Sequence, residues 1–275
     1  MSKWLTSLLL VIVLFSSCAS KFGKVLKSKD NEYKYKMAEQ YYSQKKWDKA
    51  TQLFESLFPY VKGTARFEDM YYKYAYCAYN QKDYLNAENL FKNYTENFPN
   101  GQRTEECEYM RAYCFFKQSP KVDLDQTNSS KTIALMQAFI NTHTGSERNK
   151  QAEGIISSER EKLELKDFKA AQLYFNLSYY KSAAVAFATL MDDYPDSEKS
   201  AEYKLEVVRA YYRYAENSIA EKQTERFQKV LYEASDFEDR FPQSTLRPQV
   251  EEFITLTGNH IKLLQDEQNK TTARQ

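Results

Sequence analysis

Few residues of this chain are arranged for catalysis. It contains only two histidines, His143 and His260, which stand far apart in the sequence. The adjacent acidic residues Glu105-Glu106 and Asp192-Asp193 make poor acid–base pairs, because neighbouring residues of a helix point in different directions. No glycine-rich phosphate loop, Gly-x-Ser-x-Gly or His-Glu-x-x-His motif occurs. The sequence therefore predicts a protein that is not an enzyme and has no metal or cofactor.

Cys18 is the one residue whose surroundings predict a specific modification. Lys3 precedes a short apolar run at residues 8–15, and Ser16 and Ser17 lead directly to Cys18. This order is typical of a secretory signal peptide, and the run is shorter than the ~20 apolar residues of a spanning helix. It resembles the lipobox of bacterial lipoproteins, although Phe15 stands where Leu is usual. We expect a signal peptide at 1–17 and palmitate-bearing lipidation of Cys18; the alternative is an ordinary signal peptide with an incidental cysteine.

The residues that follow Cys18 predict where the lipid anchor is delivered. In lipoproteins of this kind an Asp after the cysteine often signals retention at the inner membrane, and here the residue is Ala19. Residues 19–29 are basic, without an acidic cluster that would suggest export to the cell surface. We therefore expect residues 18–30 to form a lipidated tether at the periplasmic face of the outer membrane. With 39 basic and 38 acidic residues in the whole chain, no charge excess points to nucleic acid.

Three further cysteines could in principle form disulfides in the periplasm. Cys107 and Cys114 are seven residues apart on one expected helix, which separates them by roughly 10 Å. A disulfide needs Cα atoms within about 7 Å, so these two residues cannot pair with each other. We expect Cys77, Cys107 and Cys114 to be packed free thiols, but the sequence leaves their disulfide state open.

Composition favours a helical fold with a large aromatic core. The 275 residues include only 6 Gly and 6 Pro, whereas turn-rich sandwiches and barrels need more of both. Aromatic residues are plentiful, with 23 Tyr, 17 Phe and 2 Trp. A chain this aromatic can bury a core and is not expected to be disordered as a whole.

Alanines recur at a fixed spacing along the chain. Three pairs lie twelve residues apart: Ala38–Ala50, Ala75–Ala87 and Ala171–Ala183. An aromatic residue stands three positions before the second alanine of each pair and another four positions after it. Small residues let two helix backbones approach closely, and aromatic neighbours on the same faces fill the space around the contact. The spacing therefore predicts antiparallel helix pairs that must stack on one another to bury their apolar faces.

This pattern resembles the tetratricopeptide repeat. Residues 31–64, 68–101 and 164–197 fit it without gaps, and 105–146 and 201–244 fit with extra residues placed within Ser119–Ser130 and near Ser218–Thr224. Ala112 is the first packing alanine of the third repeat. We expect an all-α superhelical solenoid of about five helix-turn-helix repeats over residues 31–264, including a closing helix at 245–264, followed by a flexible tail at 265–275. The alternative is a generic helical bundle.

Aromatic residues also recur on the opposite face of the expected first helices. Steps of −3, +1 and +4 from the packing alanines reach eight of them in the first three repeats. These eight are Tyr35, Tyr42, Tyr72, Tyr76, Tyr79, Tyr109, Tyr113 and Phe116. Tyr and Phe offer a large contact area with few rotatable bonds, so we predict that they line a peptide-binding groove. The alternative is that the rings pack between neighbouring repeats or under the N-terminal segment.

Taken in order, these features resemble the BamD family of outer-membrane assembly lipoproteins. The resemblance rests on the basic stretch at 20–30 after Cys18, on Leu124-Asp125-Gln126-Thr127, and on the repeat tails Phe98-Pro99-Asn100, Tyr194-Pro195-Asp196-Ser197 and Phe241-Pro242-Gln243-Ser244. It implies a lipid-anchored outer-membrane subunit of the β-barrel assembly machine. Its implied partners are the POTRA domains of BamA, toward the C-terminal repeats, and C-terminal segments of unfolded outer-membrane β-barrel proteins. The alternative is a tetratricopeptide lipoprotein that serves cell-wall coordination or secretin assembly.

Overall fold

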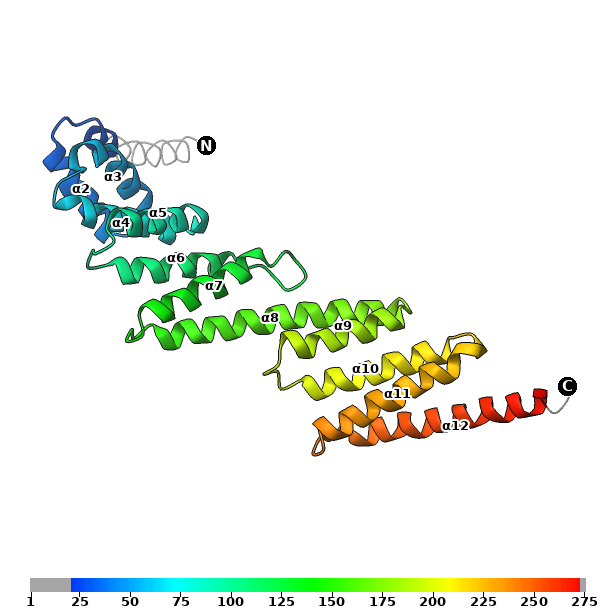
Figure 1. The fold of residues 1–275 in the computed structure, drawn as a ribbon. Helices are drawn as coiled ribbons and strands as arrows, with labels where there is room; N and C mark the ends of the chain where they lie inside the picture. Colours follow the sequence, from blue (N-terminus) through cyan, green and yellow to red (C-terminus); the bar gives the residue numbers. More distant parts are fainter. Residues whose placement is uncertain (1–20, 273–275) are drawn as a thin grey trace, which may run out of the picture. The chain divides into compact units, whose positions relative to one another are not determined.

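The structure, a computed structural model, describes residues 21–272 and is helical throughout, with no strand in that range. The predicted signal peptide at residues 1–17 and the predicted lipidation site Cys18 lie outside the described residues. Residues 21–26 form a short helix, and eleven longer ones follow (Figure 1). These are α2 (Asn31–Ser43), α3 (Trp47–Val61), α4 (Arg66–Asn80), α5 (Tyr84–Asn97), α6 (Thr104–Gln118), α7 (Thr127–Thr142), α8 (Asn149–Asn176), α9 (Tyr180–Asp193), α10 (Ser200–Glu216), α11 (Ala220–Arg240) and α12 (Arg247–Thr272).

The chain divides into two compact units, where the sequence predicts one continuous domain. The N-terminal unit ends at Arg160 and the C-terminal unit begins at Glu161, so the long helix α8 contributes residues to both. Within the N-terminal unit, helices adjacent in the chain from α2 to α7 pack on one another. In the C-terminal unit α9, α10, α11 and α12 pack in the same sequential manner. The predicted all-α tetratricopeptide-repeat fold is confirmed.

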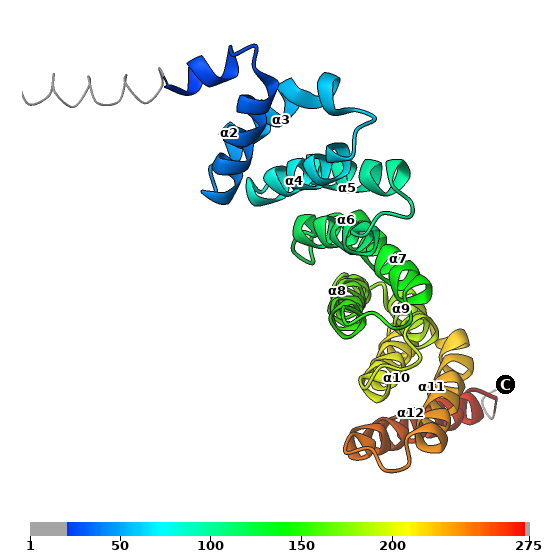
Figure 2. The ribbon, with the colours of Figure 1, turned by 90° about the vertical axis from the view of Figure 1, so that its left-hand side faces the viewer.

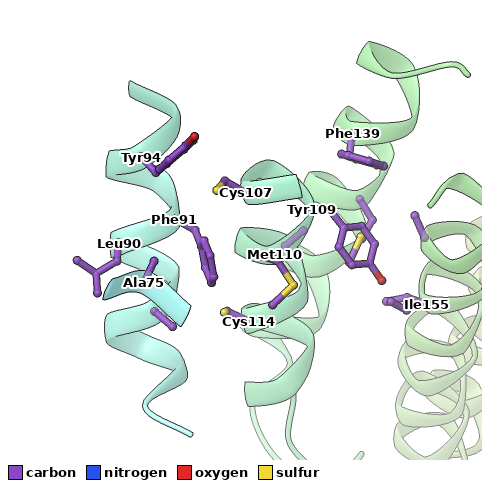
Figure 3. Packing of buried hydrophobic residues seen from close by; sticks show 14 of the residues in the cluster. Ala75, Leu90, Phe91, Tyr94, Cys107, Tyr109, Met110, Cys114, Phe139 and Ile155 are labelled. Atoms are coloured by element: carbon purple, nitrogen blue, oxygen red, sulfur yellow. The ribbon is translucent and has the colours of Figure 1, made fainter. Parts of the chain in front are cut away.

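The packing alanines lie at the contacts between helices. Each of the seven has no exposed surface; they are Ala38, Ala50, Ala75, Ala87, Ala112, Ala171 and Ala183. The equivalent positions of the two longer repeats, Thr132, Val208 and Val230, are also fully buried. Aromatic residues pack in the same cores, as Phe91 does beside Ala75 in the N-terminal unit (Figure 3). Each contact thus combines a small residue with a ring that fills the space beside it.

The turn inside the gap-free repeats has the same form each time. Three residues separate α2 from α3, α4 from α5 and α8 from α9, and the middle residue is left-handed in each turn. These residues are Lys45, Lys82 and Ser178, with φ values of 57°, 63° and 63°. None of them is glycine, so each turn holds a conformation that costs an L-residue about 1 kcal/mol or more. The helix pair around each turn must supply that energy.

Prolines mark the ends of three second helices. The helices α5, α9 and α11 each end two residues before Pro99, Pro195 or Pro242. The residue between is aromatic and leaves the helical region, with φ of −132° at Phe98, because proline disfavours a helical residue before it. Pro59 differs, since it lies within the last turn of α3, which continues to Val61.

The extra residues of the third and fifth repeats are accommodated differently. In the third repeat they form the loop 119–126 between α6 and α7, where the Gln126 amide donates to the carbonyl oxygens of Lys121 and Leu124 at 2.8 and 3.0 Å. In the fifth repeat the predicted widened turn near Ser218–Thr224 is wrong. Only residues 217–219 separate α10 from α11, and the added residues lengthen both helices. Added length that keeps the hydrogen-bonded helix avoids exposing unpaired backbone groups.

The C-terminal helix is longer than expected. We predict its end at residue 264, followed by a flexible tail, but α12 continues to Thr272. Its apolar residues Phe253, Ile254, Ile261 and Leu264 pack against the core formed by α10 and α11. The polar residues after Gln265 extend a helix whose earlier turns are already held by that packing, so they stay helical despite their composition.

The basic segment after Cys18 is also more ordered than a tether. In the helix at residues 21–26, Val25 is 4% exposed, and Phe22 and Leu26 pack against the core of the first repeat. The Phe22 ring lies 5.7 Å from the Tyr41 ring in an edge-to-face arrangement. Figure 2 shows this short helix beside α2 and α3. Asp30 then caps α2 by accepting a hydrogen bond from the backbone N–H of Tyr33 at 3.0 Å.

All three described cysteines are free and buried, in line with the expectation of packed thiols. Cys107 and Cys114 point from α6 toward α5 (Figure 3). Burial raises the pKa of Cys77 and of Cys114 to about 12 and raises that of Cys107 further. Because the thiolate is the reactive form, these side chains behave as small apolar groups at neutral pH.

We expect substitutions at two neighbouring alanines of α8 to distinguish the effect of a close helix contact on stability from the effect of helix propensity. Ala171→Leu should lower the free energy of unfolding by about 1–3 kcal/mol, because the added methylenes have no space at a fully buried position. Ala170→Leu is the matched control, because Ala170, the preceding residue of α8, is exposed. Its effect should stay within about 0.5 kcal/mol. Urea unfolding followed by circular dichroism measures both, and equal effects would contradict the close-packing role of Ala171.

Candidate functional site

The eight predicted groove residues lie on α2, α4 and α6 of the N-terminal unit, and all of them are at least partly buried. Tyr109 is only 4% exposed, and its ring lies between Phe139 and Ile155 (Figure 3). The other seven are partly buried. For part of this set, the structure therefore supports the alternative interpretation that the rings pack between neighbouring repeats.

Six of the rings form a continuous series, named here the aromatic strip. Along α4, the ring centroids of Tyr72 and Tyr76 are 4.7 Å apart, and those of Tyr76 and Tyr79 are 6.1 Å apart. Tyr79 then meets Tyr113 of the next repeat at 6.3 Å. On α6 the strip comprises Tyr109, Tyr113 and Phe116, with neighbouring centroids 5.8 and 5.6 Å apart.

Tyr35 and Tyr42 stand outside the aromatic strip. Tyr42 packs within its own repeat, with its ring 5.3 Å from Trp47 and 6.4 Å from Phe54. The guanidinium carbon of Arg66 lies over the Tyr35 ring, 5.2 Å from the ring centroid. The structure thus brings together six of the eight predicted residues.

Two hydroxyls of the aromatic strip are committed to one carboxylate. Tyr72 donates to Glu106 Oε1 at 3.1 Å, and Tyr76 donates to the same oxygen. Burial, together with the nearby Glu106 charge, raises the pKa of Tyr72 to about 12, and burial and the hydrogen bond to Glu106 raise that of Tyr76 further. Both tyrosines therefore remain protonated donors, and they tie α4 to α6.

A repeated contact of an acid, an arginine and a tyrosine covers the first positions of the predicted groove. In each of the first three repeats, an acidic residue stands three positions before the tyrosine. It pairs with an arginine located at or just before the start of the first helix of a following repeat. The same arginine lies over the tyrosine ring. We name these three groups the arginine clamps. They are Glu32–Arg66 over Tyr35, Asp69–Arg103 over Tyr72, and Glu106–Arg148 over Tyr109.

The second clamp has the closest geometry. Arg103 Nη1 lies 2.6 Å from Asp69 Oδ1, and the Arg103 guanidinium carbon lies 4.2 Å from the Tyr72 centroid. Lys73 reinforces it with contacts of 2.7 Å to Asp69 and 2.5 Å to Glu39. A planar guanidinium suits both partners, since it can stack on a ring while its N–H groups reach a carboxylate.

This clamp makes a pH-dependent contribution to stability. Burial alone would raise the pKa of Asp69, but hydrogen bonds from Lys73 and Arg103 outweigh burial and hold the pKa below its ordinary value of 3.8. Because the folded-state pKa is the lower one, the contribution is fully present above the unfolded-state pKa. It is lost as the pH falls through the folded-state value.

Sequence reasoning missed the clamps for a definable reason. The acids Glu32, Asp69 and Glu106 are evenly spaced at 37 residues, which a search for repeated charges could have found. The arginines follow their acids by 34, 34 and 42 residues, so the third pair has a different spacing. A search restricted to one fixed interval does not join all three pairs.

What remains available for a ligand is the end of the aromatic strip. Within residues 21–272, the hydroxyls of Tyr79 and Tyr113 have no hydrogen-bond partner, and both side chains are partly exposed. Phe116 adjoins Tyr113 and is partly exposed as well. By contrast, the Tyr109 hydroxyl is buried and unpaired. Tyr79, Tyr113 and Phe116 therefore define the candidate peptide-binding surface.

A second surface lies in the C-terminal unit, where the sequence analysis predicts no aromatic groove. At the end of α8 and in the turn that leads to α9, the side chains of Leu173, Leu177 and Tyr179 are 57%, 54% and 61% exposed. The turn between α10 and α11 exposes Ile219 by 67%, and both turns lie at the same end of this unit (Figure 1). Exposed apolar side chains gathered in this way commonly mark a protein interface. We call this group the apolar turn surface.

The sequence matches one known protein family over most of its length. Residues 27–225 match the YfiO family, which is described as an outer membrane lipoprotein. This match covers more than half of the 275 residues. The chain belongs to the YfiO family.

The YfiO match includes α2 to α10 and extends from the N-terminal unit into the first part of the C-terminal unit, so it contains the candidate peptide-binding surface and the apolar turn surface. No curated protein matches the sequence significantly. A crystal structure of a kinesin light chain from Podospora anserina with nearly identical TPR-like repeats aligns with a TM-score of 0.32 and 9% identity, over 78% of this chain and 96% of the other. Within residues 21–272, no helix is long and apolar enough to cross a membrane.

We expect the second arginine clamp to stabilise the N-terminal unit. Arg103→Ala should lower the free energy of unfolding by about 1 kcal/mol, because it removes a ring contact and a partly exposed ion pair together. Arg103→Lys should recover part of this loss, since it keeps the charge without the planar stack. Arg213→Ala is the control, because Arg213 is also partly exposed but pairs with Glu216 on the same helix. Urea unfolding is the measurement, and equal losses for Arg103→Ala and Arg213→Ala would contradict the clamp.

Proposed function

We propose that this YfiO-family protein is a periplasmic subunit of the β-barrel assembly machine, anchored in the outer membrane by a lipid on Cys18. In this role it binds the POTRA domains of BamA and the C-terminal segments of unfolded outer-membrane β-barrel proteins, and so assists their folding and insertion. The observation that carries the proposal is the YfiO match over residues 27–225, an outer membrane lipoprotein family. Stacked tetratricopeptide repeats supply the extended surfaces that such binding needs.

The candidate peptide-binding surface supports the substrate part of the proposal. Tyr79, Tyr113 and Phe116 are adjoining, partly exposed aromatic side chains, and the hydroxyls of Tyr79 and Tyr113 are available to peptide backbone groups. Strands of outer-membrane barrels carry aromatic girdles near their ends. A C-terminal barrel segment therefore offers aromatic side chains of the kind that pack on such rings. The earlier positions of the predicted groove serve the arginine clamps instead.

The apolar turn surface supports the BamA part. It lies toward the C-terminal repeats, where the family resemblance places the POTRA contact. Its residues Leu173, Leu177 and Tyr179 surround a three-residue turn with Ser178 in the left-handed region. Exposed leucine and tyrosine side chains on a firmly packed turn can enter a partner without a large loss of conformational entropy.

BamA should co-purify with the lipidated full-length protein from outer membranes. Leu177→Glu should reduce the BamA yield by about tenfold, because a buried interface cannot accommodate an unpaired carboxylate. Leu85→Glu is the matched control, since Leu85 is 65% exposed in the N-terminal unit and outside the proposed contact. Affinity purification with mass spectrometry measures both yields. Absence of BamA from the unmutated sample would contradict the proposed function. The proposed function would also be contradicted if depletion of this protein impaired a single envelope process and did not lower many barrel proteins together.

A peptide from the C-terminus of a barrel protein should bind less tightly when an aromatic side chain of the candidate peptide-binding surface is shortened. We expect Tyr113→Ala to weaken binding by about tenfold and Tyr113→Phe by a few-fold, because the first removes ring and hydroxyl and the second the hydroxyl alone. Tyr60→Ala is the control, since Tyr60 is 62% exposed on α3. Fluorescence anisotropy of a labelled peptide gives the affinities, and circular dichroism checks the fold. Unchanged affinity in both Tyr113 variants would remove this surface from the proposal.

A further inference from the structure

Lysines are concentrated where the chain leaves Cys18. Residues 21–49 contain nine lysines and only four acidic residues, in a chain whose overall formal charge is +1. Two of these acids are already paired with basic residues farther along the chain, Glu32 with Arg66 and Glu39 with Lys73. The beginning of the N-terminal unit therefore carries a local excess of positive charge that the composition of the whole chain conceals.

The helix at residues 21–26 holds two of these lysines outward. Its apolar residues Phe22, Val25 and Leu26 pack into the first repeat. Lys24 lies on the opposite side of the same helix, Lys21 lies at its flank, and both are exposed. Docking of the apolar side thus fixes the direction of the basic side, which a flexible tether could not do.

Two lysines of α3 and its preceding turn extend this surface. The Phe22 ring contacts the Tyr41 ring, and the Lys49 ammonium group lies 5.6 Å from both rings. The Lys46 ammonium group lies 5.8 Å from the Tyr41 ring. We name Lys21, Lys24, Lys46 and Lys49 the basic face. None of these four lysines forms an ion pair within the described part of the chain.

Chain geometry sets the distance between this face and a lipid on Cys18. Lys21 follows Cys18 by three residues, and three residues span at most about 10 Å even when fully extended. The Debye length at physiological ionic strength is about 8 Å. Lys21, at the edge of the basic face, is therefore held within roughly one screening length of any bilayer into which Cys18 is anchored.

We infer that the basic face binds the anionic phospholipid headgroups of the membrane that holds the lipid anchor. This inference rests on the lipid anchor of the proposed function. A membrane is favoured over an acidic protein partner because the covalent link places the face at the bilayer surface. The lipid and the lysines then act as two membrane signals, and firm membrane association commonly requires two. The contact holds the N-terminal unit against the bilayer.

Vesicle binding of an unlipidated full-length chain isolates the contribution of the lysines. The probe is the mature chain with Cys18→Ser, which lacks the acyl groups but keeps the whole fold. It should co-sediment with phosphatidylcholine vesicles that contain phosphatidylglycerol, and not with phosphatidylcholine alone. High salt should weaken the binding. Replacing the four lysines of the basic face with Gln should reduce the partition coefficient by about 100-fold or more, since each lysine near an anionic surface contributes about fivefold.

A matched variant separates local placement from total charge. Substitution of Lys150, Lys181, Lys199 and Lys262 with Gln removes the same number of charges from exposed positions elsewhere, and should leave vesicle binding within a few-fold of the parent. Replacing the basic face with Arg should preserve binding, and circular dichroism should show an unchanged fold in every variant. The inference is overturned if the parent does not bind, if neutral vesicles bind equally, or if both Gln variants lose binding alike. Loss of BamA co-purification with retained vesicle binding would count against the proposed function alone.

Discussion

The close approach of two helix backbones at a pair of small side chains is the contact on which the rest of this protein depends. A fully buried alanine has no side-chain freedom to lose and leaves room for the facing helix. The aromatic residues beside it then fill the remaining space, and their own positions become fixed. Because the alanines recur at twelve residues, the same helix pair forms again and again, and its left-handed turn residues Lys45, Lys82 and Ser178 recur with it. Each strained turn is evidence that packing around the alanines dominates local preference.

Tyrosines at equivalent positions of the repeats have different partners in this protein. Tyrosines that look equivalent in sequence have different fates, because Tyr72 and Tyr76 donate to Glu106 whereas the hydroxyls of Tyr79 and Tyr113 have no partner among the described residues. The first group ties neighbouring helix pairs together. The second group leaves its hydroxyls without a partner in the described part of the chain, which is why the proposed peptide contact is assigned to it. Both groups occur on α4, and they differ in which side chains a neighbouring acid or arginine reaches.

Much of the fold could be predicted because it depends on contacts close in sequence. The alanine spacing, the aromatic positions and the prolines place the helix pairs well, and they belong to each repeat by itself. The errors occur where a distant contact decides the outcome. The fifth repeat lengthens its helices instead of its turn, α12 continues to Thr272, and Phe22 and Val25 fold a presumed tether onto the first repeat. For the candidate site, helix periodicity grouped six of the eight aromatic residues as the structure does. It could not identify the arginines that lie over three of the eight, and Arg148 in particular follows a repeat of different length.

Docking of residues 21–26 on the first repeat changes how the proposed lipid anchor at Cys18 would hold the protein. A flexible tether at 18–30 would let the repeats sample a wide space below the membrane, because its reach grows with the square root of its length. The structure leaves only the first few residues outside the described fold, since Val25 is buried and Asp30 already caps α2. With the proposed lipid on Cys18, a first repeat held this closely would have few orientations relative to the bilayer. The contacts at the packing alanines would carry that restriction onward through the N-terminal unit, because each helix there packs on the next.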